Sequence, residues 1–155
     1  MRIGLYKGRS LISRLIRWQT RSTYSHASLI LPDNTVIEAW TGGVRWQRIH
    51  DGHTKGTVVD VFEPIGVFTA GIFNSLAVEQ FARSQIGKGY DYLSVARFVT
   101  RTRGDRQARW FCSELVFQAY LAGGLRLLER IEPWAVSPAL LRLSPWIRHI
   151  DTLII

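Results

Sequence analysis

The sequence contains a single cysteine, Cys112, among its 155 residues, so it cannot form an internal disulfide bond. Nothing in it therefore indicates folding in an oxidising compartment. It also lacks any apolar run close to the roughly 18 residues that a membrane-spanning helix needs. Residues 1–8 show neither the apolar stretch nor the small-residue cleavage site of a signal peptide. These absences predict a cytoplasmic protein without a transmembrane segment.

Acidic residues are scarce: 12 Asp and Glu stand against 20 Lys and Arg, which gives a net charge of +8. Such a balance favours anionic partners, namely nucleic acid, anionic lipid headgroups or phosphate-bearing polymers. Segment 97–109 is rich in arginine and predicts contact with an anionic surface; its arginines are Arg97, Arg101, Arg103, Arg106 and Arg109. Because no zinc-finger, helix-turn-helix or aromatic RNA-binding motif accompanies them, no specific nucleic acid is expected. A basic nucleic-acid-binding module stays open as an alternative function.

Composition is otherwise that of an ordinary globular protein, with 46% apolar and 21% charged residues. The length suits one domain over residues 1–155, without repeats or a linker. Hydrophobic periodicity and turn residues predict the elements in order. Strands are expected at 2–6, 27–31, 35–40, 44–49, 57–62 and 147–155, and helices at 10–20, 74–85, 92–99, 112–122 and from 138. This order predicts an α+β fold with a mostly antiparallel sheet.

Two titratable residues lie at matching positions of a predicted hairpin. Its strands flank Pro32, Asp33 and Asn34, a typical turn sequence. Because His26 opens the first strand and Glu38 lies near the end of the second, we expect them side by side. Glu38 would then accept a ring N–H of His26, fix its tautomer and stabilise the imidazolium. The alternatives are a strand-end histidine bonded to backbone, and a carboxylate that guards a sheet edge.

Cys112 lies at or near the start of a predicted helix with one apolar face, formed with Leu115, Val116, Ala119 and Tyr120, and Gly123-Gly124 is a plausible end for it. Free N–H groups and the helix dipole favour a thiolate at a helix N-terminus, so the position predicts a reactive cysteine. The alternative is a small buried hydrophobic residue.

Other candidates are weaker. His50, Asp51 and His53 share a polar loop, but two histidines and one carboxylate without a cysteine are a poor metal motif, and we predict neither a metal nor a cofactor. His149 is expected to be structural. Three tryptophans are expected either in the core or along a substrate groove: Trp40, Trp46 and Trp110.

Four segments in a fixed order carry a resemblance to a known family. They are YSHA at 24–27 with VIEA at 36–39, GKGYD at 87–91, WFCSELV at 110–116 and AVSP at 135–138. Together they resemble the circularly permuted branch of NlpC-type papain-like cysteine hydrolases, which includes YiiX-like bacterial proteins and lecithin:retinol acyltransferase-like enzymes. In that branch the histidine strand precedes the cysteine helix, as it does here. The resemblance implies a permuted papain-like fold.

The same resemblance implies roles for individual residues. Cys112 would be the nucleophile, His26 the general base and Glu38 the orienting third member, with Tyr90 beside the cysteine. The Cys112 N–H would help to bind the oxyanion. Two departures stand out: Glu38 replaces the second histidine of the acyltransferase relatives, which favours the bacterial hydrolase-like side, and an arginine-rich segment at 97–109 is not typical of the family.

The function expected from the sequence is that of a cysteine hydrolase which forms an acyl-thioester intermediate. It would act as an amidase or peptidase, or as an acyl-ester hydrolase or acyltransferase. Its substrate would be a small amide, a peptide or a lipid-acyl group. The alternative within the same fold is a catalytically silent protein that binds a lipid or acylated ligand.

Overall fold

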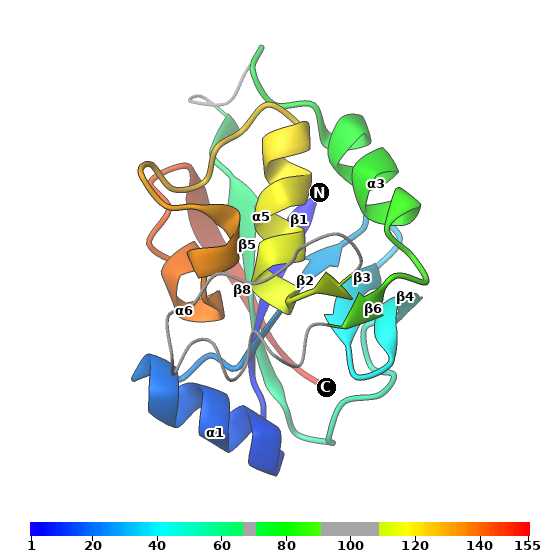
Figure 1. Ribbon diagram of the computed structural model, residues 1–155, viewed down its shortest axis with the longest axis vertical. Helices are drawn as coiled ribbons and strands as arrows, with labels where there is room; N and C mark the ends of the chain where they lie inside the picture. The colour runs from blue at the N-terminus through cyan, green and yellow to red at the C-terminus, as the bar shows by residue number, and fades with distance from the viewer. Residues whose placement is uncertain (67–70, 91–108) are drawn as a thin grey trace.

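A six-stranded antiparallel sheet forms the centre of the computed structural model, which describes residues 1–66, 71–90 and 109–155 (Figure 1). Its order is β4-β3-β2-β1-β5-β8, and every neighbouring pair runs antiparallel. The strands are β1 (Arg2–Lys7), β2 (His26–Ile30), β3 (Thr35–Trp40), β4 (Gly43–Arg48), β5 (Val58–Pro64) and β8 (Ile147–Ile154). The expected α+β class with an antiparallel sheet is confirmed, and the strand ends lie within two residues of their predicted positions.

Helices lie on one side of this sheet and at one end of it (Figure 1). They are α1 (Leu11–Thr20), α3 (Ser75–Ser84), α5 (Cys112–Ala122), α6 (Pro138–Leu141) and the 3-10 turn η1 (Pro133–Ala135). Polar caps begin three of them, since Ser10, Asn74 and Ser137 accept hydrogen bonds from first-turn N–H groups. Two short parallel strands, β6 (Gly89–Tyr90) and β7 (Arg109–Trp110), form a separate ladder just before α5.

The core lies between α5 and the central strands. α5 packs against β2, β3 and α3, and Leu115, Val116 and Ala119 are completely buried. Strand residues that face the helix include Leu29 and Ile37, which stand opposite each other across β2 and β3. Because residues alternate faces along a strand, His26 and Glu38 lie on the opposite face from these two.

Some predicted details differ or lie outside the described residues. In α3 the core contact is made by Val78 and Ala82, one turn apart, and Leu76 is 61% exposed. The helix expected at 92–99 and the arginine-rich segment up to residue 108 lie outside the described residues. Within the described residues, no helix is long and apolar enough to cross a membrane.

Candidate active site

The hairpin brings His26 and Glu38 into direct contact. Asn34 adopts the left-handed conformation with φ of 62°, and the Asp33 carboxylate accepts the Thr35 N–H at 3.0 Å, so the turn is tight. The Nε2–H of His26 donates to Glu38 Oε2 at 2.6 Å. The contact expected from the sequence is therefore present.

Glu38 accepts hydrogen bonds on both of its oxygens. Arg45 donates to Oε1 from Nε at 3.0 Å and from Nη2 at 2.8 Å, and Gln47 donates to the same atom at 2.9 Å. His53 Nε2 lies 3.2 Å from Oε2, beside His26. The carboxylate is fully buried on an interior strand, so it does not guard a sheet edge. Its donors fix its position and balance its charge.

The electrostatics favour a neutral His26 next to an ionised Glu38. Burial raises the pKa of Glu38, but the charge and hydrogen bond of His26 and the hydrogen bond of His53 outweigh it and hold that pKa well below its usual range. Burial lowers the pKa of His26 by more than the Glu38 charge raises it. At neutral pH the ring therefore carries its proton on Nε2, and Nδ1 is left as the basic nitrogen.

Cys112 lies at the end of β2 where His26 begins the strand. The ladder between β2 and β3 is formed by two residue pairs, Leu29 with Ile37 and Ile30 with Val36, and the strands do not pair further toward His26. There the backbone N–H of Ala27 donates to the Cys112 sulfur. At this point Ala27, the residue after His26, is bonded to the Cys112 thiol and not to a residue of β3.

The protonation state of Cys112 differs from the sequence expectation. Cys112 is 1% exposed, and burial raises the pKa of its thiol to about 12, although the N–H groups of Ala27 and Ser113 act in the opposite direction. The helix N-terminus was expected to favour the thiolate. That prediction is wrong for the resting protein. Removing a thiolate from water is unfavourable, and the few N–H dipoles near the sulfur stabilise the charge by less than the water did. The resting pair is a neutral thiol and a neutral imidazole.

His53 joins the site although the sequence did not single it out as a catalytic candidate. Its ring stacks on Tyr6 with 4.6 Å between centroids and meets the Trp40 ring edge-on at 5.0 Å. Trp40 also meets His26 edge-on at 4.7 Å. His50, from the same loop, is exposed instead. The loop composition alone gave no signal that separates these two histidines.

The remaining predicted residues are only partly placed. The backbone of Tyr90 pairs with Trp110, two residues before Cys112, but the Tyr90 side chain lies outside the described part of the structure. Trp110 meets Phe81 edge-on at 6.0 Å, and Trp46 is 51% exposed on β4. Of the three tryptophans, Trp40 is the one in ring contact with His26.

His26, Glu38 and His53 also form a set of metal-type donors. Their ligand atoms all lie within 4.8 Å of one another, and they are the single such group in the part of the chain that the structure describes. Two ligands of one tetrahedral zinc ion, each at about 2.1 Å from it, stand about 3.4 Å apart. The 2.6 Å between His26 Nε2 and Glu38 Oε2 is instead the length of a hydrogen bond. As arranged, these residues do not fit a metal centre.

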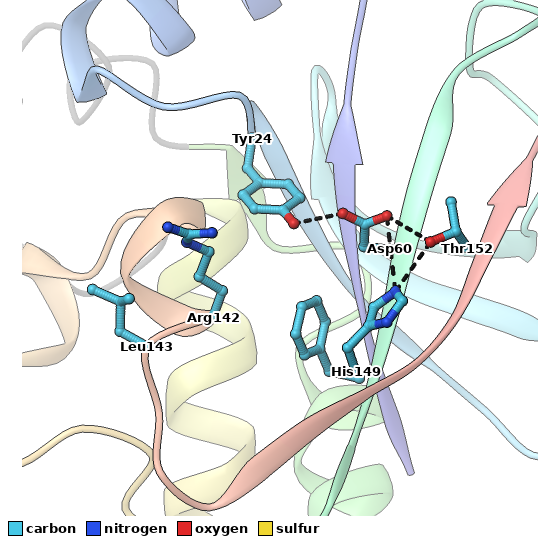
Figure 2. A pocket seen from close by; sticks show the side chains of 7 residues that line it. Tyr24, Asp60, Arg142, Leu143, His149 and Thr152 are labelled. Atoms are coloured by element: carbon cyan, nitrogen blue, oxygen red, sulfur yellow. Dashed lines mark hydrogen bonds and ion pairs between the residues drawn. The ribbon is translucent and has the colours of Figure 1, made fainter.

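A second polar cluster lines a cleft of about 530 Å³ over β5 and β8 (Figure 2). Asp60 accepts a hydrogen bond from Tyr24 at 2.5 Å and one from Thr152 at 2.9 Å, and Lys7 forms an ion pair with it at 2.8 Å. The Nε2–H of His149 donates to the Thr152 hydroxyl oxygen at 3.0 Å, because the proton of that hydroxyl goes to Asp60. Because Asp60 binds groups from several segments of the sheet, we expect this cluster to stabilise the packing of β5 against its neighbours.

Comparison with known proteins finds a likeness in fold. No family model matches the sequence. No curated protein matches it either. Among solved structures, the chain is similar to one described as the metalloprotein YiiX from Escherichia coli O157:H7, of the family DUF1105, with a TM-score of 0.73 and 20% identity over 99% of this chain and 96% of that one. At this identity the likeness concerns the fold.

Proposed function

We propose that the protein is a cysteine hydrolase of permuted papain-like fold, with Cys112 as nucleophile, His26 as general base and Glu38 as the group that orients His26. One observation carries the proposal. His26 uses Nε2 to bind a buried carboxylate, which leaves Nδ1 as the ring nitrogen for a thiol that lies against the next residue, Ala27. Nucleophile, base and orienting acid in this order are the parts that activate a thiol.

The proposed reaction starts from the neutral pair. The Cys112 sulfur attacks the substrate carbonyl carbon while His26 Nδ1 takes the thiol proton, so no free thiolate is needed beforehand. Glu38 stabilises the imidazolium that forms. The oxyanion is bound by the N–H of Cys112 at the start of α5. When the intermediate collapses, His26 returns the proton to the leaving amine or alcohol, and water then releases the acyl group from the thioester.

Both the order of residues along the chain and the fold support this proposal. The histidine strand precedes the cysteine helix, as in the permuted hydrolases that the sequence resembles, and the fold is similar to that of YiiX. The substrate class is an amide or ester carbonyl of a small amide, a peptide or a lipid-acyl group. A catalytically silent ligand-binding protein of the same fold would keep the contact between His26 and Glu38, but its Cys112 would not become acylated.

Metal binding is the second candidate, because YiiX is described as a metalloprotein and the trio of His26, Glu38 and His53 has the donor types that zinc prefers. The spacing speaks against it, since His26 would have to give up its hydrogen bond to Glu38. Arg45 also already neutralises the carboxylate. We therefore derive no step that involves a metal.

The test is acylation of Cys112 by 4-nitrophenyl esters and anilides of increasing acyl length, followed by release of nitrophenol or nitroaniline and by the mass of the intact protein. The parent should show a burst and carry one acyl group on Cys112. His26→Ala should lose the burst, whereas His149→Ala, the matched control at a half-exposed histidine outside the site, should keep it. A chelator should have no effect.

Two results would overturn the proposal. Acylation that is absent, or equal in the parent and in His26→Ala, would make Cys112 a structural residue and favour the silent binding protein. Activity that a chelator removes and zinc restores, with stoichiometric metal in the purified protein, would favour the metal site instead.

A further inference from the structure

Positive charge is concentrated at the start of the chain. Residues 1–32 contain six Lys and Arg and no Asp or Glu, in a protein whose net charge is +8. Much of this charge lies on α1 or next to it, and α1 lies at one end of the molecule, away from α3 (Figure 1). This end is therefore strongly cationic.

The outer face of α1 combines this charge with an exposed indole. Ser13 and Ile16 are buried and turn one side of the helix toward the protein. Trp18 follows Ile16 by two positions, so it points to the opposite side, and it is 76% exposed. Arg14 stands four positions before Trp18, on the same side of the helix, and Arg21 follows the last helical residue in the left-handed conformation; both are exposed. Within the described residues, neither arginine has an acidic partner.

We propose that this face, formed by Arg14, Trp18 and Arg21, docks the protein onto anionic lipid membranes. Guanidinium groups are attracted by anionic headgroups, and an indole with an apolar body and a polar N–H is favoured at the level of those headgroups. A basic surface without the indole would suit nucleic acid equally well. The exposed Trp18 favours lipid, because a large apolar ring that is in contact with water is stabilised when it enters the membrane–water interface.

The docking face is joined to the candidate active site by a short segment. Only residues 21–25 separate α1 from His26, and β2 begins there. The docking itself is independent of the cysteine chemistry, so we test it on Cys112→Ser protein. Its failure would leave the hydrolase proposal untouched, and the reverse also holds.

The experiment measures partition onto vesicles by co-sedimentation and by the emission of tryptophan. Vesicles of pure phosphatidylcholine are compared with equimolar phosphatidylcholine and phosphatidylglycerol, at low and high salt. We expect binding to the anionic vesicles alone, weaker at high salt because charges are screened. Arg14→Gln with Arg21→Gln should weaken binding about 30-fold, since each basic residue near such a surface contributes about 1 kcal/mol. Trp18→Ala should abolish the blue shift of the emission.

Matched controls make the result specific. Arg48→Gln with Arg130→Gln removes the same charge at two exposed arginines elsewhere, and Trp46→Ala removes another exposed indole. These variants should bind like the parent, and thermal unfolding verifies that every variant folds. Equal loss in the control arginine variant, equal binding to neutral vesicles, tighter binding to duplex DNA, or self-association that Trp18→Ala removes would each overturn the proposal.

Discussion

The smallest unit that the structure defines is a histidine whose Nε2 is held by a buried carboxylate. His26 donates from Nε2 to a carboxylate that is held in turn by Arg45 and Gln47, so its ring has little freedom to rotate. A base held in this way needs no reorganisation when it accepts a proton. In the hydrolase that we propose, Glu38 would therefore act on the reaction through His26.

Glu38→Gln tests that consequence. The variant keeps the shape of the side chain and removes the charge that stabilises the imidazolium. We expect the rate of Cys112 acylation by a 4-nitrophenyl ester to fall about 10²- to 10⁴-fold. Stopped-flow measurement of the burst gives that rate. Asp33→Asn, at an exposed turn carboxylate, should leave it unchanged, and a Glu38→Gln rate within a factor of two of the parent would contradict the role.

We expect His53 to be a positioning residue in the proposed hydrolase, because its hydrogen bond goes to Glu38. His53→Ala removes one donor from Oε2 and should cost about 1 kcal/mol of unfolding free energy. The acylation rate should fall less than about tenfold, since His26 still holds the same oxygen. His53→Gln, whose amide can donate to Glu38, should restore most of both. A loss as large as that of Glu38→Gln, without rescue, would place His53 in the catalytic machinery.

Sequence reasoning found residues whose neighbours are local and missed those whose neighbours are distant. His26 and Glu38 are twelve positions apart across one turn, so the hairpin register alone predicts their contact. His53 reaches Glu38 from the loop after β4, and hydrophobic periodicity does not predict how that loop folds back onto β3. The raised pKa of Cys112 was missed for a different reason, because burial depends on everything that packs around the thiol.

At the scale of whole elements, Asp60 joins strands that are remote in sequence. It lies on β5 and contacts Lys7 of β1, Tyr24 just before β2 and Thr152 of β8. Burial raises the pKa of Asp60, but hydrogen bonds from these three groups outweigh it and lower that pKa. The carboxylate thus fastens the strand that carries the C-terminus to those that carry the candidate site.

Asp60→Ala should lower the free energy of unfolding by about 2 kcal/mol, because it leaves the nearly buried Tyr24 hydroxyl without its acceptor and Lys7 without its partner. Thermal unfolding followed by circular dichroism should show a fall of about 4–8 °C in Tm. Glu63→Ala is the control on the same strand, since its partner Arg148 is 63% exposed. It should cost less than about 0.5 kcal/mol. Equal losses of unfolding free energy in the two variants would show that Asp60 does not stabilise the sheet more than an exposed ion pair does.

The elements themselves were more predictable than their arrangement. Hydrophobic periodicity and caps such as Ser10 and Asn74 are local signals, and these elements form where the sequence predicts them. The pairing of β5 with β8 joins residues about ninety positions apart, and alternation along a strand does not specify its neighbour. For the same reason the sequence predicts a sheet without its strand order.

At the scale of the whole molecule, the site depends on contacts that close the fold. β1 lies between β2 and β5, so the first residues of the chain hold the histidine strand in place. Tyr120, in the cysteine helix, donates to the Met1 carbonyl at 3.1 Å. The first residues of the chain therefore contact both the strand that carries His26 and the helix that begins at Cys112, so the proposed site depends on the complete fold.

This coupling predicts how stability depends on pH. The folded-state pKa of His26 lies below its unfolded value of about 6.5, so the unfolded chain takes up a proton first as the pH falls. Stability should be full above about pH 6.5 and decrease below it. Glu38 and Asp60, also with lowered pKa values, should add a second loss below about pH 4.3. Tm measured between pH 8 and pH 3 should show both steps.

The first step can be assigned to one residue, because the titratable and charged groups that act on His26 are Glu38 on β3, His53 on the loop after β4 and Arg45 on β4. His26→Gln keeps a donor for Glu38 but does not titrate, so it should flatten the decrease between about pH 6.5 and 4.5. His149→Gln, at a half-exposed histidine, should retain that decrease. If the two variants exchange these behaviours, the acid sensitivity arises at the surface, and the buried pair is not what limits the stability of the fold.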